Sequence, residues 1–150
     1  MKIIVDADAC PVKEIIFSVA RELQIPVILV SSIAHSMPEE DIAEIRWVDK
    51  NPQAADIEII NLSQYQDIIV TGDYGLAALV LGKGSRAISF RGIIYQEKKM
   101  DSMLESRYLS RKIRESGGRT KGPKPFVQKD AELFEKSLRH LIELNITEKN

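Results

Sequence analysis

Hydrophobic residues are grouped in four short runs in the first two thirds of the chain. The runs cover Lys2–Val5, Val27–Ser31, Asp67–Thr71 and Arg86–Phe90. Their hydrophobic residues follow one another without regular polar alternation, which is typical of strands buried on both faces of a parallel sheet. We therefore predict four such strands, with Ile45–Val48 as an extra strand at the edge of the sheet.

Hydrophobic residues at helical spacing separate these runs. They predict helices from Pro11 to Leu23, from Asn51 to Leu62 and from Tyr74 to Leu81. Proline suits the first turn of a helix, and Asn51 with Pro52 forms a typical N-cap and N1 pair. Because strands and helices alternate, the sequence predicts an α/β fold with three layers and a doubly wound, mainly parallel sheet.

The last third of the chain has a different pattern. Residues 98–115 predict a basic amphipathic helix whose apolar side would consist of Met100, Met103, Leu104, Tyr108 and Ile113. Residues 116–126 contain three glycines and two prolines, which are incompatible with regular structure. A final helix is predicted from Lys129 to Leu144, and its buried side would consist of Leu133, Phe134, Leu138, Leu141 and Ile142.

The composition is that of a globular protein. The chain has 150 residues, of which 44% are hydrophobic and 29% charged, so we expect a single domain over residues 1–150. No hydrophobic run approaches the length of about 18 residues that a membrane span requires. The single cysteine, Cys10, excludes an intramolecular disulfide, and a cytoplasmic location is expected. The oligomeric state is left open.

Charge is distributed unevenly along the chain. Residues 1–82 contain 5 basic and 13 acidic residues, a net charge of −8. Residues 83–129 contain 13 basic and 4 acidic residues, a net charge of +9. This asymmetry indicates an anionic partner for the later segment and allows a cation site in the earlier one, although a basic helix can also simply face solvent.

Two of the predicted strands end in aspartates. Asp6 and Asp8 follow the first strand, and Asp73 follows the third hydrophobic run. Ligands of parallel sheets bind beyond the carboxyl ends of the strands, and Asp56 would lean toward the same region from its helix. Four clustered carboxylates repel one another, and Mg²⁺ or Mn²⁺ would relieve this because both ions prefer oxygen ligands.

Helix capping offers a different explanation for two of these aspartates. Asp73 could cap the helix that follows it, and Asp8 could do the same for the helix near Pro11. Asp6 closes a buried strand and has no routine capping role. A shared metal site formed by Asp6, Asp8, Asp56 and Asp73 therefore stays open beside capping, and the resemblance described next favours it.

Five segments together resemble a known family. They are Val5–Lys13, Ala54–Asp56, Val70–Ala77, Arg91–Gly92 and Gly117–Phe126. In combination they are similar to the YaiI/YqxD family of bacterial proteins, and the match spans nearly the whole chain.

The resemblance implies a fold and an activity. The domain of that family is similar to PIN-like (NYN/PIN) nucleases, in which acids clustered at strand ends bind Mg²⁺ or Mn²⁺ and hydrolyse RNA. The resemblance matches Asp6 with the first of these acids and Asp73 with the acid of a Thr-x-Asp motif. Asp8 and Asp56 would be further members of the same acidic cluster. PIN domains usually have another acid after the next strand, where this chain has Phe90-Arg91-Gly92. Arg91 could bind phosphate there instead, or the site could be degenerate.

Basic residues near the Gly/Pro segment are candidates for binding RNA. With Arg91, the candidates for contacts with phosphate are Arg107, Arg111, Arg119, Lys121 and Lys124. Aromatic residues could stack on bases, namely Trp47, Tyr74, Tyr95 and Tyr108, although packing within the protein is the more ordinary role of each.

Three functions remain open at this stage. The favoured one is a metal-dependent, ribonuclease-like phosphodiester hydrolase. A noncatalytic RNA-binding or ribosome-associated module is the alternative that the missing late acid favours. A phosphatase of the haloacid dehalogenase type is a third, because Asp6-x-Asp8 after a strand is similar to its nucleophile motif. Ala77 stands where the second acid of that enzyme's later motif would be expected.

Overall fold

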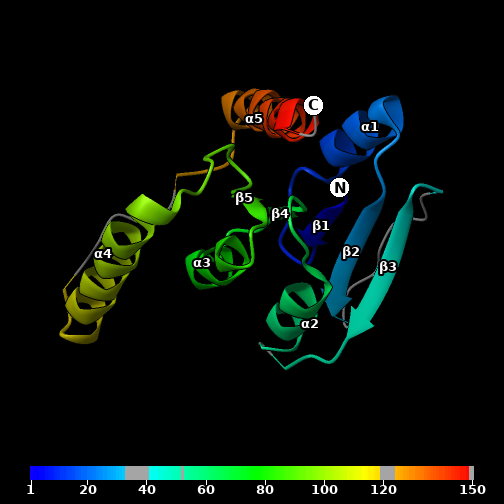
Figure 1. The fold of residues 1–150 in the computed structure, drawn as a ribbon. Coiled ribbons are helices and arrows are strands. Elements are labelled where there is room, and N and C mark those ends of the chain that lie inside the picture. Colours follow the sequence, from blue (N-terminus) through cyan, green and yellow to red (C-terminus); the bar gives the residue numbers. More distant parts are fainter. Residues whose placement is uncertain (33–40, 52, 119–123, 149–150) are drawn as a thin grey trace.

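A parallel sheet forms the centre of the protein. The computed structural model describes residues 1–32, 41–51, 53–118 and 124–148, without the side chain of Met103. In this part of the chain, five strands pair in the order β3-β2-β1-β4-β5, and every neighbouring pair is parallel (Figure 1). The strands are β1 (Ile3–Asp6), β2 (Val27–Ser32), β3 (Ala43–Val48), β4 (Ile68–Val70) and β5 (Arg86–Ile88). The predicted α/β fold is confirmed, and β3 is the predicted edge strand.

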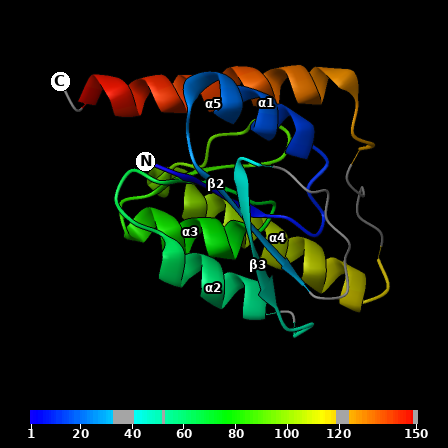
Figure 2. The ribbon, with the colours of Figure 1, turned by 90° about the vertical axis from the view of Figure 1, so that its right-hand side faces the viewer.

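Helices cover both faces of the sheet. On one face lie α1 (Lys13–Leu23) and α5 (Gln128–Glu148), and on the other lie α2 (Ala54–Leu62) and α3 (Tyr74–Gly82) (Figures 1 and 2). Alternate residues of β1 serve the two resulting cores, since Ile3 and Val5 pack toward α1 and α5 while Ile4 packs toward α2 and α3. This two-sided burial explains why the strand sequences show continuous hydrophobic runs.

The start of α1 differs from the prediction by two residues. The helix begins at Lys13, because residues 7–12 first form a turn in which the Cys10 N–H donates to the carbonyl of Ala7 at 3.2 Å. The Val12 carbonyl then accepts the first helical hydrogen bond, from Ile16. The N-cap role considered for Asp8 is therefore wrong.

The fourth helix, α4 (Glu97–Glu115), packs on α3 and extends away from the sheet (Figure 1). Its predicted apolar side is wrong for three residues: Met100 is buried, whereas Leu104, Tyr108 and Ile113 are exposed. Among the described side chains of α4, Met100 near its N-terminus reaches the hydrophobic core, whereas the apolar residues of the later turns face solvent. On α5 the predicted burial of Leu133 is also wrong, since that side chain is 46% exposed, while the other four predicted residues are buried.

Among the described residues, no helix combines the length and the apolar character that crossing a bilayer requires.

Candidate functional site: an acidic pocket beside an arginine groove

The two central strands place the first acids. From β1 the chain proceeds outward through β2 to β3, and it then returns to the other side of β1 to form β4 and β5. The carboxyl ends of β1 and β4 are therefore a topological switch point, where parallel sheets open a crevice for ligands. Asp6 ends β1, and Asp73 lies three residues after β4.

Thr71 connects these two aspartates. Its hydroxyl donates to Oδ2 of Asp6 at 2.9 Å and accepts the backbone N–H of Asp73 at 3.0 Å. Oδ1 of Asp73 in turn accepts the N–H of Leu76 at 3.2 Å, so Asp73 caps α3 as the sequence allowed. One buried threonine thus holds the carboxylate of Asp6 and the backbone of Asp73, while the Leu76 N–H holds the carboxylate of Asp73.

Asp8 is held by the neighbouring strand β2. Its Oδ1 accepts the hydroxyl of Ser31 at 2.7 Å and the N–H of Ser32 at 3.0 Å. Asp56 lies in the first turn of α2, where the helix dipole favours a negative charge. The four aspartates thus reach the edge of the sheet from different elements.

A pocket of about 380 Å³ brings all four aspartates together. It is lined by Asp6, Asp8, Ser32, Val48, Asp49, Lys50, Asn51, Ala55, Asp56 and Asp73. We call this the acidic pocket. The prediction that Asp6, Asp8, Asp56 and Asp73 converge in space therefore agrees with the geometry, whereas their ligand and catalytic roles stay predictions.

Burial and crowding perturb two of these carboxyl groups. Burial raises the pKa of Asp6 above its ordinary value, the Thr71 hydroxyl opposes this, and the charges of Asp56, Asp73 and Asp8 raise it further. Burial also raises the pKa of Asp56, and the charge of Asp73 adds to the effect. A cation in the acidic pocket would reduce the cost of keeping Asp6 and Asp56 ionised, because it offsets both their burial and their mutual repulsion.

The donor set of the acidic pocket suits a hard divalent cation. Carboxylate oxygens are preferred by Mg²⁺ and Mn²⁺, and Mg²⁺ is commonly held by one or two carboxylates while it retains several waters. Within the described residues, no three His, Cys, Asp or Glu side chains are close enough together to form a complete metal site. The pocket therefore fits an ion that is bound directly by one or two carboxylates and otherwise through water.

A groove lined by arginines adjoins the acidic pocket. It has a volume of about 270 Å³ and is lined by Asp73, Gly75, Leu104, Arg107, Tyr108, Arg111 and Arg114. We call it the arginine groove. Asp73 belongs to both cavities, so the acidic N-terminal half and the basic later segment of the chain meet at this residue.

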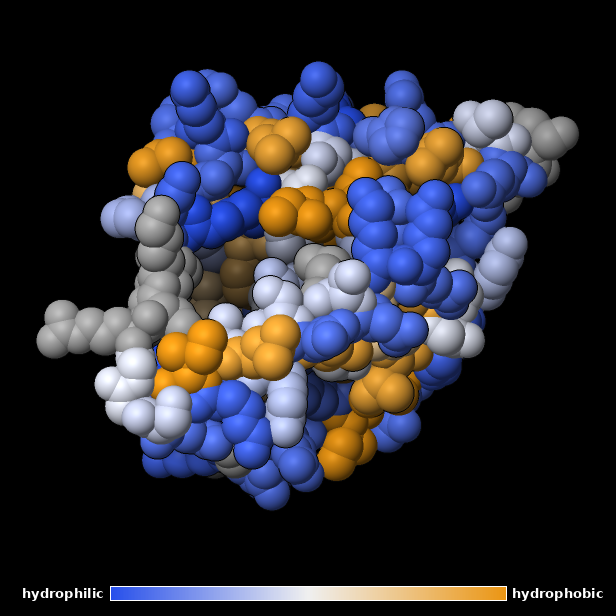
Figure 3. All heavy atoms as spheres, turned by 90° about the vertical axis from the view of Figure 1, so that its left-hand side faces the viewer, coloured by the Kyte–Doolittle hydropathy of each residue, from blue (hydrophilic) through white to orange (hydrophobic). Residues whose placement is uncertain are grey.

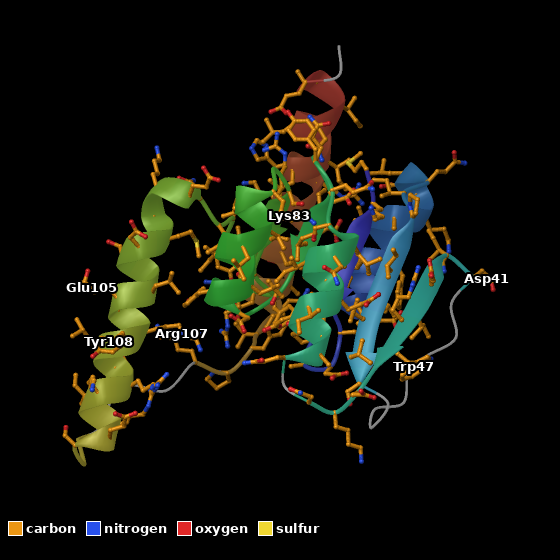
Figure 4. All side chains as sticks on the ribbon, turned by 60° about the horizontal axis from the view of Figure 1, so that its bottom comes forward. Asp41, Trp47, Lys83, Glu105, Arg107 and Tyr108 are labelled. Carbon is orange, nitrogen blue, oxygen red and sulfur yellow. The ribbon has the colours of Figure 1, made fainter. Side chains whose placement is uncertain are left out.

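Tyr74 orients one of these arginines. The guanidinium of Arg107 lies over the Tyr74 ring at 5.4 Å from its centre, and Figure 4 shows Arg107 extending from α4 toward α3. Tyr74 itself packs edge-on against the buried Tyr95, with ring centres 5.6 Å apart. Tyr74 and Tyr95 therefore pack within the protein. The other two candidate stacking residues are exposed: 56% of the surface of Tyr108 and 48% of that of Trp47, on the edge strand, are accessible to solvent.

The other predicted phosphate-binding residues have different positions. Arg91 donates to Asp130 at 3.1 Å and to the Lys124 carbonyl, and its guanidinium lies 5.9 Å from the centre of the Phe126 ring. It therefore fastens the start of α5 to the loop after β5, and it lines neither cavity. Lys124 is exposed on that connection, and Arg119 and Lys121 lie outside the described residues.

The sequence analysis missed several residues that line or support the acidic pocket. Ser31 and Ser32 end β2, and Asp49, Lys50 and Asn51 follow β3. Applying the strand-end rule to every predicted strand would have found them. The hydrogen bond from Ser31 to Asp8 has no such signal, because it depends on the register between β1 and β2.

Cys10 does not contribute a reactive group. Burial raises the pKa of its thiol to about 11, so the nucleophilic thiolate is disfavoured at neutral pH.

Comparison with known proteins identifies relatives over nearly the whole chain. The family model described as "Uncharacterized BCR, YaiI/YqxD family" matches residues 4–144. Proteins named UPF0178 are 47% identical in Bacillus anthracis and in Bacillus thuringiensis, each over 146 residues that cover 96% of this chain and 100% of theirs. A UPF0178 protein of Bacillus cereus is 48% identical over 136 residues, which cover 89% of this chain and 93% of that protein.

One similar solved structure is a mutant of Rae1 (YacP) from Bacillus subtilis. Its TM-score is 0.46 and its sequence identity 19%, over 96% of this chain and 99% of that one.

Proposed function

The chain belongs to the YaiI/YqxD family, and we propose that it is a metal-dependent, ribonuclease-like hydrolase of RNA phosphodiester bonds. One observation carries the proposal: a pocket lined by five aspartates, the four predicted ones and Asp49, at the switch point of the sheet continues, through Asp73, into a groove lined by three arginines. The first cavity suits a divalent cation and the second suits phosphate, and metal-dependent phosphodiester hydrolysis uses both.

The aspartates have distinct roles in this proposal. Asp6 and Asp73 are the principal ligands, because the Thr71 hydroxyl orients the carboxylate of Asp6 and the Leu76 N–H orients that of Asp73. Either Asp8 or Asp56 completes the set from the rim of the acidic pocket. A Mg²⁺ or Mn²⁺ held by these carboxylates would supply an activated water and would stabilise negative charge on the phosphoryl group. Arg107 and Arg111 hold the adjoining phosphates of the strand.

Hydrolysis of a fluorescent RNA strand tests the proposal. Wild-type protein should cleave it with Mg²⁺ or Mn²⁺ and not in EDTA. Asp73→Asn should lower the rate by at least about 100-fold, a loss of about 2.7 kcal/mol of transition-state stabilisation, while the asparagine preserves the cap of α3. Asp41→Asn, an exposed site just before β3, is the matched control and should cleave normally. Cleavage that persists in EDTA or in Asp73→Asn would refute the assignment.

A noncatalytic RNA-binding module is the second candidate. It is favoured by the hydrogen bonds that already occupy Asp6, Asp8 and Asp73, together with the lack of a complete ligand set among the described side chains. This function predicts RNA binding that is equal in EDTA and in Mn²⁺, without cleavage under either condition.

A further inference from the structure

The inner face of α4 combines positive charge with an exposed aromatic ring. Leu104, Arg107, Tyr108, Arg111 and Arg114 are spaced three or four residues apart, so they share one face of the helix and line the arginine groove together. Figure 3 views the molecule from the side of α4, where hydrophobic side chains lie among hydrophilic ones at the surface. Tyr108 is 56% exposed, and it lies among the arginines Arg107, Arg111 and Arg114 on this face.

The cations of the arginine groove are oriented by neighbouring side chains. The Arg107 guanidinium lies over the Tyr74 ring at 5.4 Å from its centre, and this cation–π contact orients the side chain. Arg111 forms an exposed ion pair with Glu115 at 3.3 Å, which holds the side chain weakly along the helix. Lys112 lies over the Tyr108 ring at 5.5 Å from its centre, and the same ring lines the groove.

We propose that the arginine groove is a subsite for one unpaired nucleotide of an RNA strand, with its base stacked on Tyr108 and its phosphate bound by Arg107 and Arg111. This inference rests on the proposed function, since Asp73 joins the groove to the acidic pocket in which the neighbouring phosphate would lie. An aromatic ring beside guanidinium groups is the combination that binds single-stranded nucleic acid.

The subsite selects unpaired nucleotides. A base within a duplex has both of its faces covered by stacked neighbours, whereas an unpaired base can lay one face on an aromatic side chain. The groove volume of about 270 Å³ is at the small end of the range for ligand sites, which suits one nucleotide and not a base pair. An acidic peptide would satisfy the arginines, but it would not require the flat face of Tyr108.

Binding measured in EDTA tests this subsite separately from hydrolysis. The probes are a fluorescent strand of eight uridines and an RNA hairpin whose duplex stem has the same number of phosphates. Tyr108→Ala should weaken binding of the single strand between about 5-fold and 150-fold, the loss of one stacked base. Tyr108→Phe should bind like the wild type, and so should Leu109→Ala, a control on the opposite, exposed side of the same helix. Binding of the hairpin should not depend on Tyr108.

The outcomes distinguish the subsite from the proposed function. Loss of strand binding in Tyr108→Ala supports the subsite even if no cleavage is found in the hydrolysis assay. Equal strand binding by wild type and Tyr108→Ala overturns the subsite, even if the protein cleaves RNA. A glutamate octamer that binds with the same dependence on Tyr108 would also overturn it, because the groove would then recognise acidic peptides.

Discussion

Asp6 is the residue on which the acidic pocket depends most. It is a carboxylate at the end of a buried central strand, and one of its oxygens accepts the Thr71 hydroxyl. Four other aspartates line the same pocket, and the charges of Asp56, Asp73 and Asp8 raise the pKa of Asp6 in addition to the effect of burial. An ionised Asp6 therefore lowers the stability of the protein without metal, and a cation should reverse the effect.

Replacing Asp6 by Asn should show how much the charge of Asp6 destabilises the metal-free protein. The amide oxygen can still accept the Thr71 hydroxyl, while the charge repulsion disappears. The melting temperature without metal should stay the same or rise by up to about 4 °C, which corresponds to about 1 kcal/mol for a chain of this size. The stabilisation by saturating Mn²⁺, about 2.7 kcal/mol at one hundred times the dissociation constant, should be lost. Thermal melts with and without Mn²⁺ measure both effects, and a marked fall in the metal-free melting temperature would indicate that the Asp6 charge is structural.

The stability of the protein should also depend on pH through Asp6 and Asp56. Both have raised pKa values in the folded state, compared with 3.8 as the ordinary value. Between that value and the raised one, the folded state binds protons that the unfolded state has released, so stability falls as pH rises through this window. In urea unfolding without metal, the advantage of Asp6→Asn should therefore be small near pH 3.5 and grow toward pH 7. An advantage that does not change with pH would contradict the raised pKa of Asp6.

The loop between β5 and α4 is fixed by one glycine. Gly92 has φ +86°, and an added Cβ would lie 2.7 Å from the backbone of Leu133 and Phe134 in α5. Gly92→Ala should lower the free energy of unfolding by about 2–4 kcal/mol, since strain and overpacking add together. Gly82→Ala is the control, because no atom of the described residues lies within 4 Å of its added Cβ. Chemical denaturation compares the two, and equal stabilities would show that α5 can shift away from the loop.

Arg91 and Arg111 allow a structural arginine to be compared with a proposed binding arginine. Arg91→Ala should lower the free energy of unfolding by about 1–2 kcal/mol, because it removes the hydrogen bonds to Asp130 and Lys124, and it should leave RNA affinity unchanged. Arg111→Ala should leave stability unchanged and reduce the slope of log affinity against log salt by about 0.7, one phosphate contact. RNA affinity measured over a salt series, together with urea unfolding, separates the two. If Arg91→Ala lowered the RNA affinity and left the stability unchanged, Arg91 would be an RNA-binding residue after all.

The elements show how far the sequence determines the fold. Continuous hydrophobic runs specified the parallel strands, because burial on both faces leaves no polar alternation. The exposure of Leu104 and Tyr108 could not be predicted, since periodicity shows that a helix has an apolar side and not whether another element covers it. The aspartates were found from their strand-end positions, whereas the bridge through Thr71 and the true role of Arg91 depend on contacts between distant segments.

At the scale of the whole molecule, the uneven charge distribution becomes a spatial arrangement. The acidic N-terminal half supplies the pocket at the switch point of the sheet, and the basic helix α4 lies beside it on α3. Asp73 is the point of contact, because it caps α3 and lines both cavities. A net charge of −1 for the entire chain conceals this division.

The central claim is that the acidic pocket holds a divalent cation. Crystals soaked in Mn²⁺ and measured at the manganese absorption edge test it most directly, since the anomalous signal locates the ion. We predict a peak in the acidic pocket, with carboxylate oxygens of Asp6, Asp73 and either Asp8 or Asp56 within about 2.0–2.3 Å directly or through bound water at about twice that distance. A fully soaked crystal with no peak in this pocket, or with its strongest peak elsewhere, would contradict the account.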